Sequence, residues 1–232
     1  MARFAMLLLC LSLVCCDSGD IYPEQKRVEE VEVRVEARFD FENMQAFPQN
    51  YRIVWGAFVG TSPYPLAFEV ATKPATGTWQ AATLQTVPRG TTHMALALLD
   101  RVEDKARYFF HRVPLGGDGE LTVDGTVDLA PFARVQAQIF TPQCIQCHGA
   151  GGLAAGLDLT EGNARANLVD APSQPDNSPK MRVEKYSLQN SFLLDVLTLR
   201  PATITTNHTT LSSLDAVDDI ELIRAWITSP ND

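Results

Sequence analysis

The chain has 232 residues, of which 45% are hydrophobic and 20% charged, and its formal net charge at pH 7 is -9. This composition is that of a folded globular protein and argues against extensive disorder. The length allows one large domain or two small ones. The acidic excess argues against a nucleic-acid-binding protein, because no basic stretch could neutralise a row of phosphates.

The first sixteen residues predict a secretory signal. They carry one positive charge, at Arg3, and are apolar from Phe4 to Cys16 apart from Ser12. This run is shorter than the ~20 residues that a membrane span needs. Its end, Leu13-Val14-Cys15-Cys16, resembles the cleavage box of bacterial lipoproteins, which implies lipidation of Cys16. An ordinary signal cut nearby and an uncleaved anchor are the alternatives.

This interpretation decides the meaning of the five cysteines. Cys10 and Cys15 leave with the signal and Cys16 carries the lipid, so Cys144 and Cys147 are the thiols that remain. Two cysteines three positions apart are not a disulfide scaffold. The polar residues 17–27 that follow the signal are typical of a tether that lifts a domain off a membrane.

Residues 28–130 predict an all-β domain. From Val31 to Phe41 apolar and charged residues alternate, which is typical of a strand with one buried face. Turn-rich pieces separate six further runs. Seven short strands at this spacing predict an immunoglobulin-like β-sandwich. The six further strands are expected at Tyr51–Val59, Leu66–Thr72, Trp79–Thr86, Thr92–Leu99, Arg107–Val113 and Leu121–Leu129.

The aromatic and histidine side chains of this half are expected to be structural. Trp55, Phe58 and Phe68 are candidate core residues. His93 and His111 fall within predicted strands, and neither has a second ligand type at metal spacing. We find no nucleophile elbow, phosphate loop or paired-carboxylate signature in this half.

Residues 131–232 predict an all-α domain. Pro131 stands where a first helical turn tolerates proline, and apolar residues recur at helical spacing as far as Phe140. Two further helices are predicted over Ser187–Leu199 and Leu214–Thr228. Ser212-x-x-Asp215 is a plausible capping box for the last of them.

The pattern C-x-x-C-H, formed by Cys144, Cys147 and His148, follows the first predicted helix. Two thiols at this spacing can each form a thioether with a vinyl group of haem, and the adjacent histidine is then directed at the iron. A zinc site that adds His208 is an alternative, although a histidine directly after Cys147 fits it poorly. A redox pair would belong to an α/β pattern, which is absent. The sequence therefore predicts one covalent haem c.

A longer stretch around this motif resembles a known family. The segment "IFTPQCIQCHGAGGLAAGLDLTEGNARANLVD", with "NSFLLDVL" and "IELIRAWI", is similar to the single-haem cytochrome c domains of bacterial extracytoplasmic proteins, a group related to the planctomycete cytochrome c domains. The resemblance implies a C-terminal all-α cytochrome c-like domain over residues 131–232, whose first and last helices cross beside the haem. That crossing would bury Phe132, Val135, Ile139, Trp226 and Ile227.

The distal iron ligand departs from the family pattern. Such domains usually supply a methionine from a Met-Pro before the last helix, whereas the loop "RPATITTNHTTLSS" contains none. His208 stands at roughly the expected place, and Met181 is the alternative distal ligand. An open or exchangeable position is the third possibility.

These observations favour a membrane-anchored lipoprotein that passes single electrons between extracytoplasmic redox proteins and catalyses no reaction of its own. One alternative is a haem-based redox or gas sensor. Another is a surface-binding sandwich with an auxiliary haem domain, since a sandwich fold does not imply a function.

Overall fold

The computed structural model describes residues 30–31, 33–75, 77–78, 82–116, 120–150, 154, 156–173, 179–199, 201–202, 204, 206–210 and 216–231. The predicted signal, the tether and the lipidation site at Cys16 lie outside the described residues. Within the described ranges, no helix is long and apolar enough to cross a membrane.

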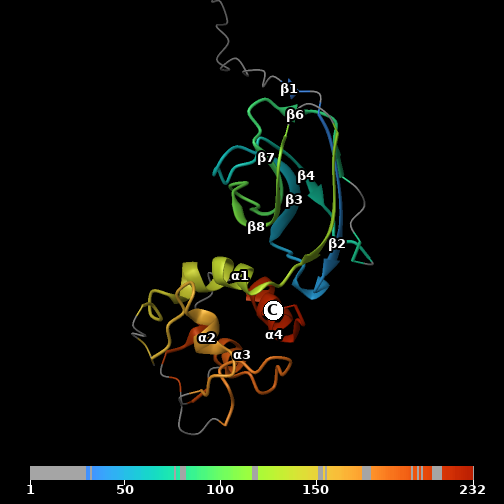
Figure 1. The fold of residues 1–232 in the computed structure, drawn as a ribbon. Coiled ribbons are helices and arrows are strands. Elements are labelled where there is room, and N and C mark those ends of the chain that lie inside the picture. Colours follow the sequence, from blue (N-terminus) through green and yellow to red (C-terminus); the bar gives the residue numbers. More distant parts are fainter. Residues whose placement is uncertain are drawn as a thin grey trace, which may run out of the picture.

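Two facing sheets form the N-terminal half (Figure 1). Neighbouring strands run antiparallel except β2 and β9, which pair in parallel along nine residues each. A short pair, β1 (Glu30–Val31) with β6 (Val87–Pro88), adds to one end. The three-stranded sheet contains β5 (Ala82–Leu84), β2 (Arg34–Glu42) and β9 (Glu120–Asp128), and the four-stranded sheet contains β4 (Ala67–Ala71), β3 (Tyr51–Phe58), β7 (His93–Asp100) and β8 (Ala106–Pro114).

The alternating pattern predicted for the first long strand is confirmed. Every second residue of β2 from Val35 to Phe41 is buried, and the residues between them are exposed or half-buried. Phe39 of β2 lies 5.7 Å from the ring of Trp55 in β3, so side chains of both sheets meet in one core. The outer face of the four-stranded sheet has a second apolar cluster around Phe58, packed by Phe68 and Phe109. The expected sandwich is therefore present.

The predicted all-α C-terminal domain is wrong. Strands make up 35% and helices 24% of the structure, and the C-terminal half has only short helices joined by irregular chain and isolated bridges. Turn residues interrupt it: Gly156, Gly162, Asp170 and Tyr186 all have positive φ. The helices are α1 (Phe132–Val135), continued by a π-helix (Gln136–Cys144), then α2 (Ala164–Leu168), α3 (Phe192–Thr198), a 3-10 helix (His208–Thr210) and α4 (Ala216–Thr228).

The three predicted helices form to different extents. The first becomes one α-helical turn followed by the π-helix. The second covers only Phe192–Thr198, because the residues before it form bridges between Met181 and Ser191 and between Glu184 and Ser187. The last forms nearly as predicted, and its proposed capping box lies outside the described residues. Apolar spacing thus marked several buried residues correctly, but Leu199 is 71% exposed and the helix lengths differ from the prediction.

The two halves share one hydrophobic core, which runs from the sandwich through Leu129 and Val135 to Trp226. Figure 1 shows α1 lying below the sheets and α4 beside the end of β2. The domain division at residue 130 therefore stays a prediction.

Buried polar contacts fasten the halves together. Arg134 in α1 is fully buried, donates to the carbonyls of Ala46 (3.0 Å) and Leu129, and donates through Nε to Gln138 (3.1 Å). Burial lowers the pKa of Arg134 to about 10, so the guanidinium stays charged at neutral pH. From α4, Asp218 accepts the backbone N–H groups of Gln49 (2.8 Å) and Asn50 (2.7 Å).

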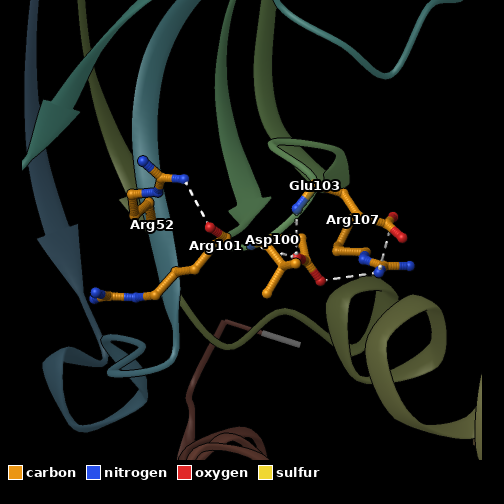
Figure 2. A network of polar contacts seen from close by, with 6 residues as sticks. Arg52, Asp100, Arg101, Glu103 and Arg107 are labelled. Carbon is orange, nitrogen blue, oxygen red and sulfur yellow. Dashed lines mark hydrogen bonds and ion pairs between the residues drawn. The ribbon is translucent and has the colours of Figure 1, made fainter.

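An ionic cluster closes the β7–β8 hairpin at the same end of the sandwich (Figure 2). Asp100 accepts the N–H groups of Val102 (2.8 Å) and Glu103 (3.1 Å) and pairs with Arg107 at 2.9 Å. These bonds lower the pKa of Asp100 to about 2. The hairpin is thereby held where β8 contacts the π-helix.

Replacing Arg134 by methionine is expected to lower the free energy of unfolding by about 3–5 kcal/mol. The change leaves two carbonyls without their donor and two nearby buried carboxylates without their cation. Urea denaturation followed by far-UV circular dichroism measures the loss. The matched control Arg38→Met, on the exposed face of β2, should change stability by less than about 0.5 kcal/mol. Equal losses in the two variants would show that Arg134 does not fasten the halves.

Candidate haem site

The C-x-x-C-H motif begins where the π-helix ends, at Cys144. The carbonyl of Cys144 accepts the N–H groups of Cys147 (3.2 Å) and His148 (2.9 Å), which closes the motif into one turn. Ile145 donates to Phe140, five residues back. π-helical turns are rare and are frequent at functional sites. The turn therefore presents both cysteines and the histidine from one compact piece of backbone.

Gly149 allows this turn to close. A Cβ atom at Gly149 would lie 2.7 Å from the carbonyl oxygen of Ile145, closer than side chains approach backbone. The carbonyl of His148 next accepts the N–H of Leu159 at 2.8 Å, which fixes the chain that leaves the motif. The backbone on both sides of His148 is thus held.

The two thiols have different surroundings. Cys144 is half-buried against the shared core, and Cys147 is exposed. Burial raises the pKa of Cys144 to about 12, with the negative charges of Asp219 and Cys147 adding to the effect. A reactive redox cysteine needs a lowered pKa. The environment of Cys144 therefore opposes the redox-pair alternative to thioether formation.

His148 of the motif and His208 of the 3-10 helix lie close together although they are far apart in the sequence. Their ring centroids lie 6.1 Å apart and the ring planes are inclined by 25°. Nδ1 of His148 lies 3.1 Å from the carbonyl oxygen of Ala154, and Nδ1 of His208 lies 2.9 Å from that of Thr206. Because a carbonyl can only accept, each Nδ1 carries the proton. The other ring nitrogen, Nε2, is the one that would bind a metal.

This arrangement fits two axial ligands of one iron. Metal–imidazole bonds of about 2.0–2.1 Å on opposite sides of one metal place the ring centres about 6 Å apart. Histidines that bind metals commonly donate their other ring N–H to a backbone carbonyl, as both rings do here. Burial lowers the pKa of His148, with the charges of His208 and Arg182 acting in the same direction. This favours the neutral imidazole.

The other candidate ligands are placed differently. Met181 lies in bridges to Pro172 and Ser191, and its carbonyl accepts the N–H of Phe192 at 2.9 Å. Among the residues that the structure describes, no group of three or more His, Cys, Asp or Glu side chains could hold a metal ion. The described residues therefore do not assemble the four-ligand zinc site that Cys144, Cys147, His148 and His208 would have to form.

Aromatic packing supports the site from behind. The rings of Phe132 in α1 and Trp226 in α4 lie 5.1 Å apart, so the first and last helices of this half do meet. Burial is confirmed for Val135, Ile139, Trp226 and Ile227, while Phe132 is partly buried.

The remaining histidines lie away from this pair, in the sandwich. The ring of His93 stacks on Phe58 with centroids 5.7 Å apart, and His111 meets the edge of Phe39 at 5.9 Å. Both contacts are with aromatic residues of the sandwich, as a structural role requires.

Sequence reasoning missed the polar groups beneath the motif. Gln138 and Gln143 on the π-helix both donate to Asp219 on α4, at 2.6 and 3.4 Å. Gln138 and Asp219 stand among apolar residues of predicted helices, and that position was the only available signal for their burial. The predicted helix ended at Phe140, and Pro142, which lies inside the observed π-helix, is the one sequence signal for an irregular helix there.

We expect Gly149→Ala to lower the free energy of unfolding of the haem-free protein by about 1–3 kcal/mol, since the backbone at Ile145 must shift. Thermal or urea unfolding measures the change. The control is Gly116→Ala, where an added Cβ meets nothing within 4 Å. If the two variants were equally stable, the close approach at Ile145 would not constrain the motif.

In comparisons with known proteins, no family model, curated protein or solved structure matches the chain.

Proposed function

We propose that the protein binds one haem covalently, as c-type cytochromes do, and transfers single electrons outside the cytoplasm. The observation that carries the proposal is the pairing of His148 with His208 at a ring separation of 6.1 Å, beside two cysteines in C-x-x-C-H spacing. Nδ1 of each imidazole lies within hydrogen-bond distance of a backbone carbonyl, a contact that histidine ligands of metals commonly make. Position, spacing and ligand chemistry point to the same cofactor.

Each residue of the site has a distinct role in this proposal. Cys144 and Cys147 each add their sulfur and hydrogen across a vinyl double bond, which forms a C–S bond with no leaving group and no change of iron oxidation state. His148 is the proximal ligand, held by Ala154, and His208 is the distal ligand, held by Thr206. When bound, haem supplies a one-electron change between ferric and ferrous iron.

Electron transfer is favoured over gas sensing because two histidines fill both axial positions. A sensor for a small ligand needs an open or easily vacated position. Two histidines also set a lower reduction potential than histidine with methionine, other factors being equal. Exposure of Cys147 leaves an edge of the attached group within reach of a partner.

The proposed partners are extracytoplasmic redox proteins, reached from a membrane to which lipid on Cys16 anchors the chain. An acidic protein with a net charge of -9 docks most readily on a basic surface. The sandwich then serves as the rigid support that holds the haem site away from the membrane. These assignments rest on the haem proposal.

The decisive test is expression of the full chain together with the haem c maturation machinery. We expect covalent haem to remain on the denatured polypeptide in a haem stain, together with a reduced-minus-oxidised spectrum of a c-type haem. The double variant Cys144→Ser/Cys147→Ser should lose the stain. Absence of covalent haem from the unmodified protein would refute the proposed function.

Replacing His208 by alanine is expected to convert a low-spin haem into a high-spin haem that binds carbon monoxide. The unmodified protein in the ferrous state should bind carbon monoxide weakly, because His208 competes for the same position on the iron. Absorption spectra with and without carbon monoxide measure both effects. Met181→Leu is the matched control and should keep the low-spin spectrum. The opposite result, with only Met181→Leu changing the spectrum, would assign the distal position to Met181.

A further inference from the structure

Asp219 is a buried carboxylate directly beneath the cysteine motif. Only 2% of its surface is exposed, although acidic residues are rarely buried without partners. Its two oxygens accept the amide N–H groups of Gln138 at 2.6 Å and Gln143 at 3.4 Å. Both donors are on the π-helix. The helix that ends at Cys144 therefore holds a carboxylate of α4 against its inner side.

The carboxylate lies close enough to Cys144 to act on it electrostatically. Gln143, which bonds Asp219, is the residue before Cys144. The negative charge of Asp219 is one of the causes that raise the pKa of the Cys144 thiol. A group attached to Cys144 would lie in the same field.

Two other buried charged residues lie near Asp219. Its sequence neighbour Asp218 is a second buried carboxylate and accepts the backbone N–H groups of Gln49 and Asn50 in the sandwich. The buried cation Arg134 donates to Gln138, which in turn donates to Asp219. The negative charges of Asp219 and Asp218 both act on this one guanidinium.

We propose that Asp219 is a positioning residue that sets the reduction potential of the site by placing a buried negative charge beside the haem attached at Cys144. This inference rests on the proposed function. A ferric centre has one more positive charge than a ferrous one, so a nearby carboxylate stabilises the ferric state more. Burial weakens screening by solvent and strengthens the effect.

The principal test compares midpoint potentials of the haem-loaded protein with those of Asp219→Asn. Asparagine keeps the shape of the aspartate side chain. Its amide oxygen can accept from one glutamine and its NH2 group can donate to the other, whose side-chain amide can rotate to present its oxygen. We expect the equilibrium to shift toward ferrous iron by on the order of tenfold, which is about 59 mV more positive for one electron. Glu221→Gln removes one charge from the exposed side of the same helix, where 44% of the side chain is accessible. Equal shifts in both variants would overturn the inference.

A second variant covers the case in which Asp219→Asn does not fold. Gln143→Leu removes an amide that partly compensates the carboxylate and leaves Asp219 in place. The potential should then move to a less positive value, opposite to the effect of Asp219→Asn. A positive or null shift in Gln143→Leu would contradict the role assigned to Asp219.

A haem-free measurement separates failure of this inference from failure of the proposed function. In full-length protein made without haem attachment, iodoacetamide labelling of Cys144 is followed by mass spectrometry of its peptide. Asp219→Asn should speed labelling at least twofold, because loss of the negative charge favours the thiolate, and Glu221→Gln should leave the rate unchanged. Faster labelling without any haem on the unmodified protein would refute the function and keep the charge effect. The inference alone would be refuted if the unmodified protein binds haem but Asp219→Asn changes neither the labelling rate nor the midpoint potential.

Discussion

The buried guanidinium of Arg134 is the contact on which the remaining structure depends. It joins the first turn of α1 to the carbonyls of Ala46 and Leu129, which follow β2 and β9. Those two strands form the full-length parallel pair of the sandwich. A buried charge is costly without hydrogen bonds, so those that Nε and Nη1 of Arg134 donate favour one position of the C-terminal half relative to the sheets. Nη2 has no hydrogen-bond partner among the described residues. The sandwich is therefore part of the foundation of the site.

Further hydrogen bonds follow from Arg134 along the π-helix toward the cysteines. Gln138 lies one helical turn later and links the guanidinium to Asp219, and Gln143, immediately before Cys144, also donates to Asp219. Polar groups thus hold one side of this helix, while Val135, Ile139 and Phe140 enter the hydrophobic core. The motif follows a helix that is held by contacts on both sides, which suits the rigid planar cofactor that we propose for this site.

What the sequence could predict follows from how local each signal is. Alternation along β2 is a local pattern with one physical interpretation, and strands appear close to their predicted bounds. The C-x-x-C-H spacing is equally local and predicts a compact turn, which forms. Apolar spacing from Leu188 to Leu199 predicted one continuous helix. Bridges at Ser187 and Ser191 replace its first part, α3 forms only over Phe192–Thr198, and Leu199 is exposed. The approach of His208 to His148 and the burial of Asp219 depend on contacts between distant segments, which no local pattern encodes.

The two neighbouring carboxylates of α4 explain why the halves cannot adjust independently. Successive residues of a helix point about 100° apart, and Asp218 faces the sandwich loop while Asp219 faces the π-helix. Moving α4 to improve one set of hydrogen bonds would strain the other, and Trp226 resists the same motion through its contact with Phe132. The helix is therefore fixed from two directions. Because Asp219 is held by this double attachment, its distance from Cys144 is set by the whole fold, which is the condition for a stable electrostatic effect on the site.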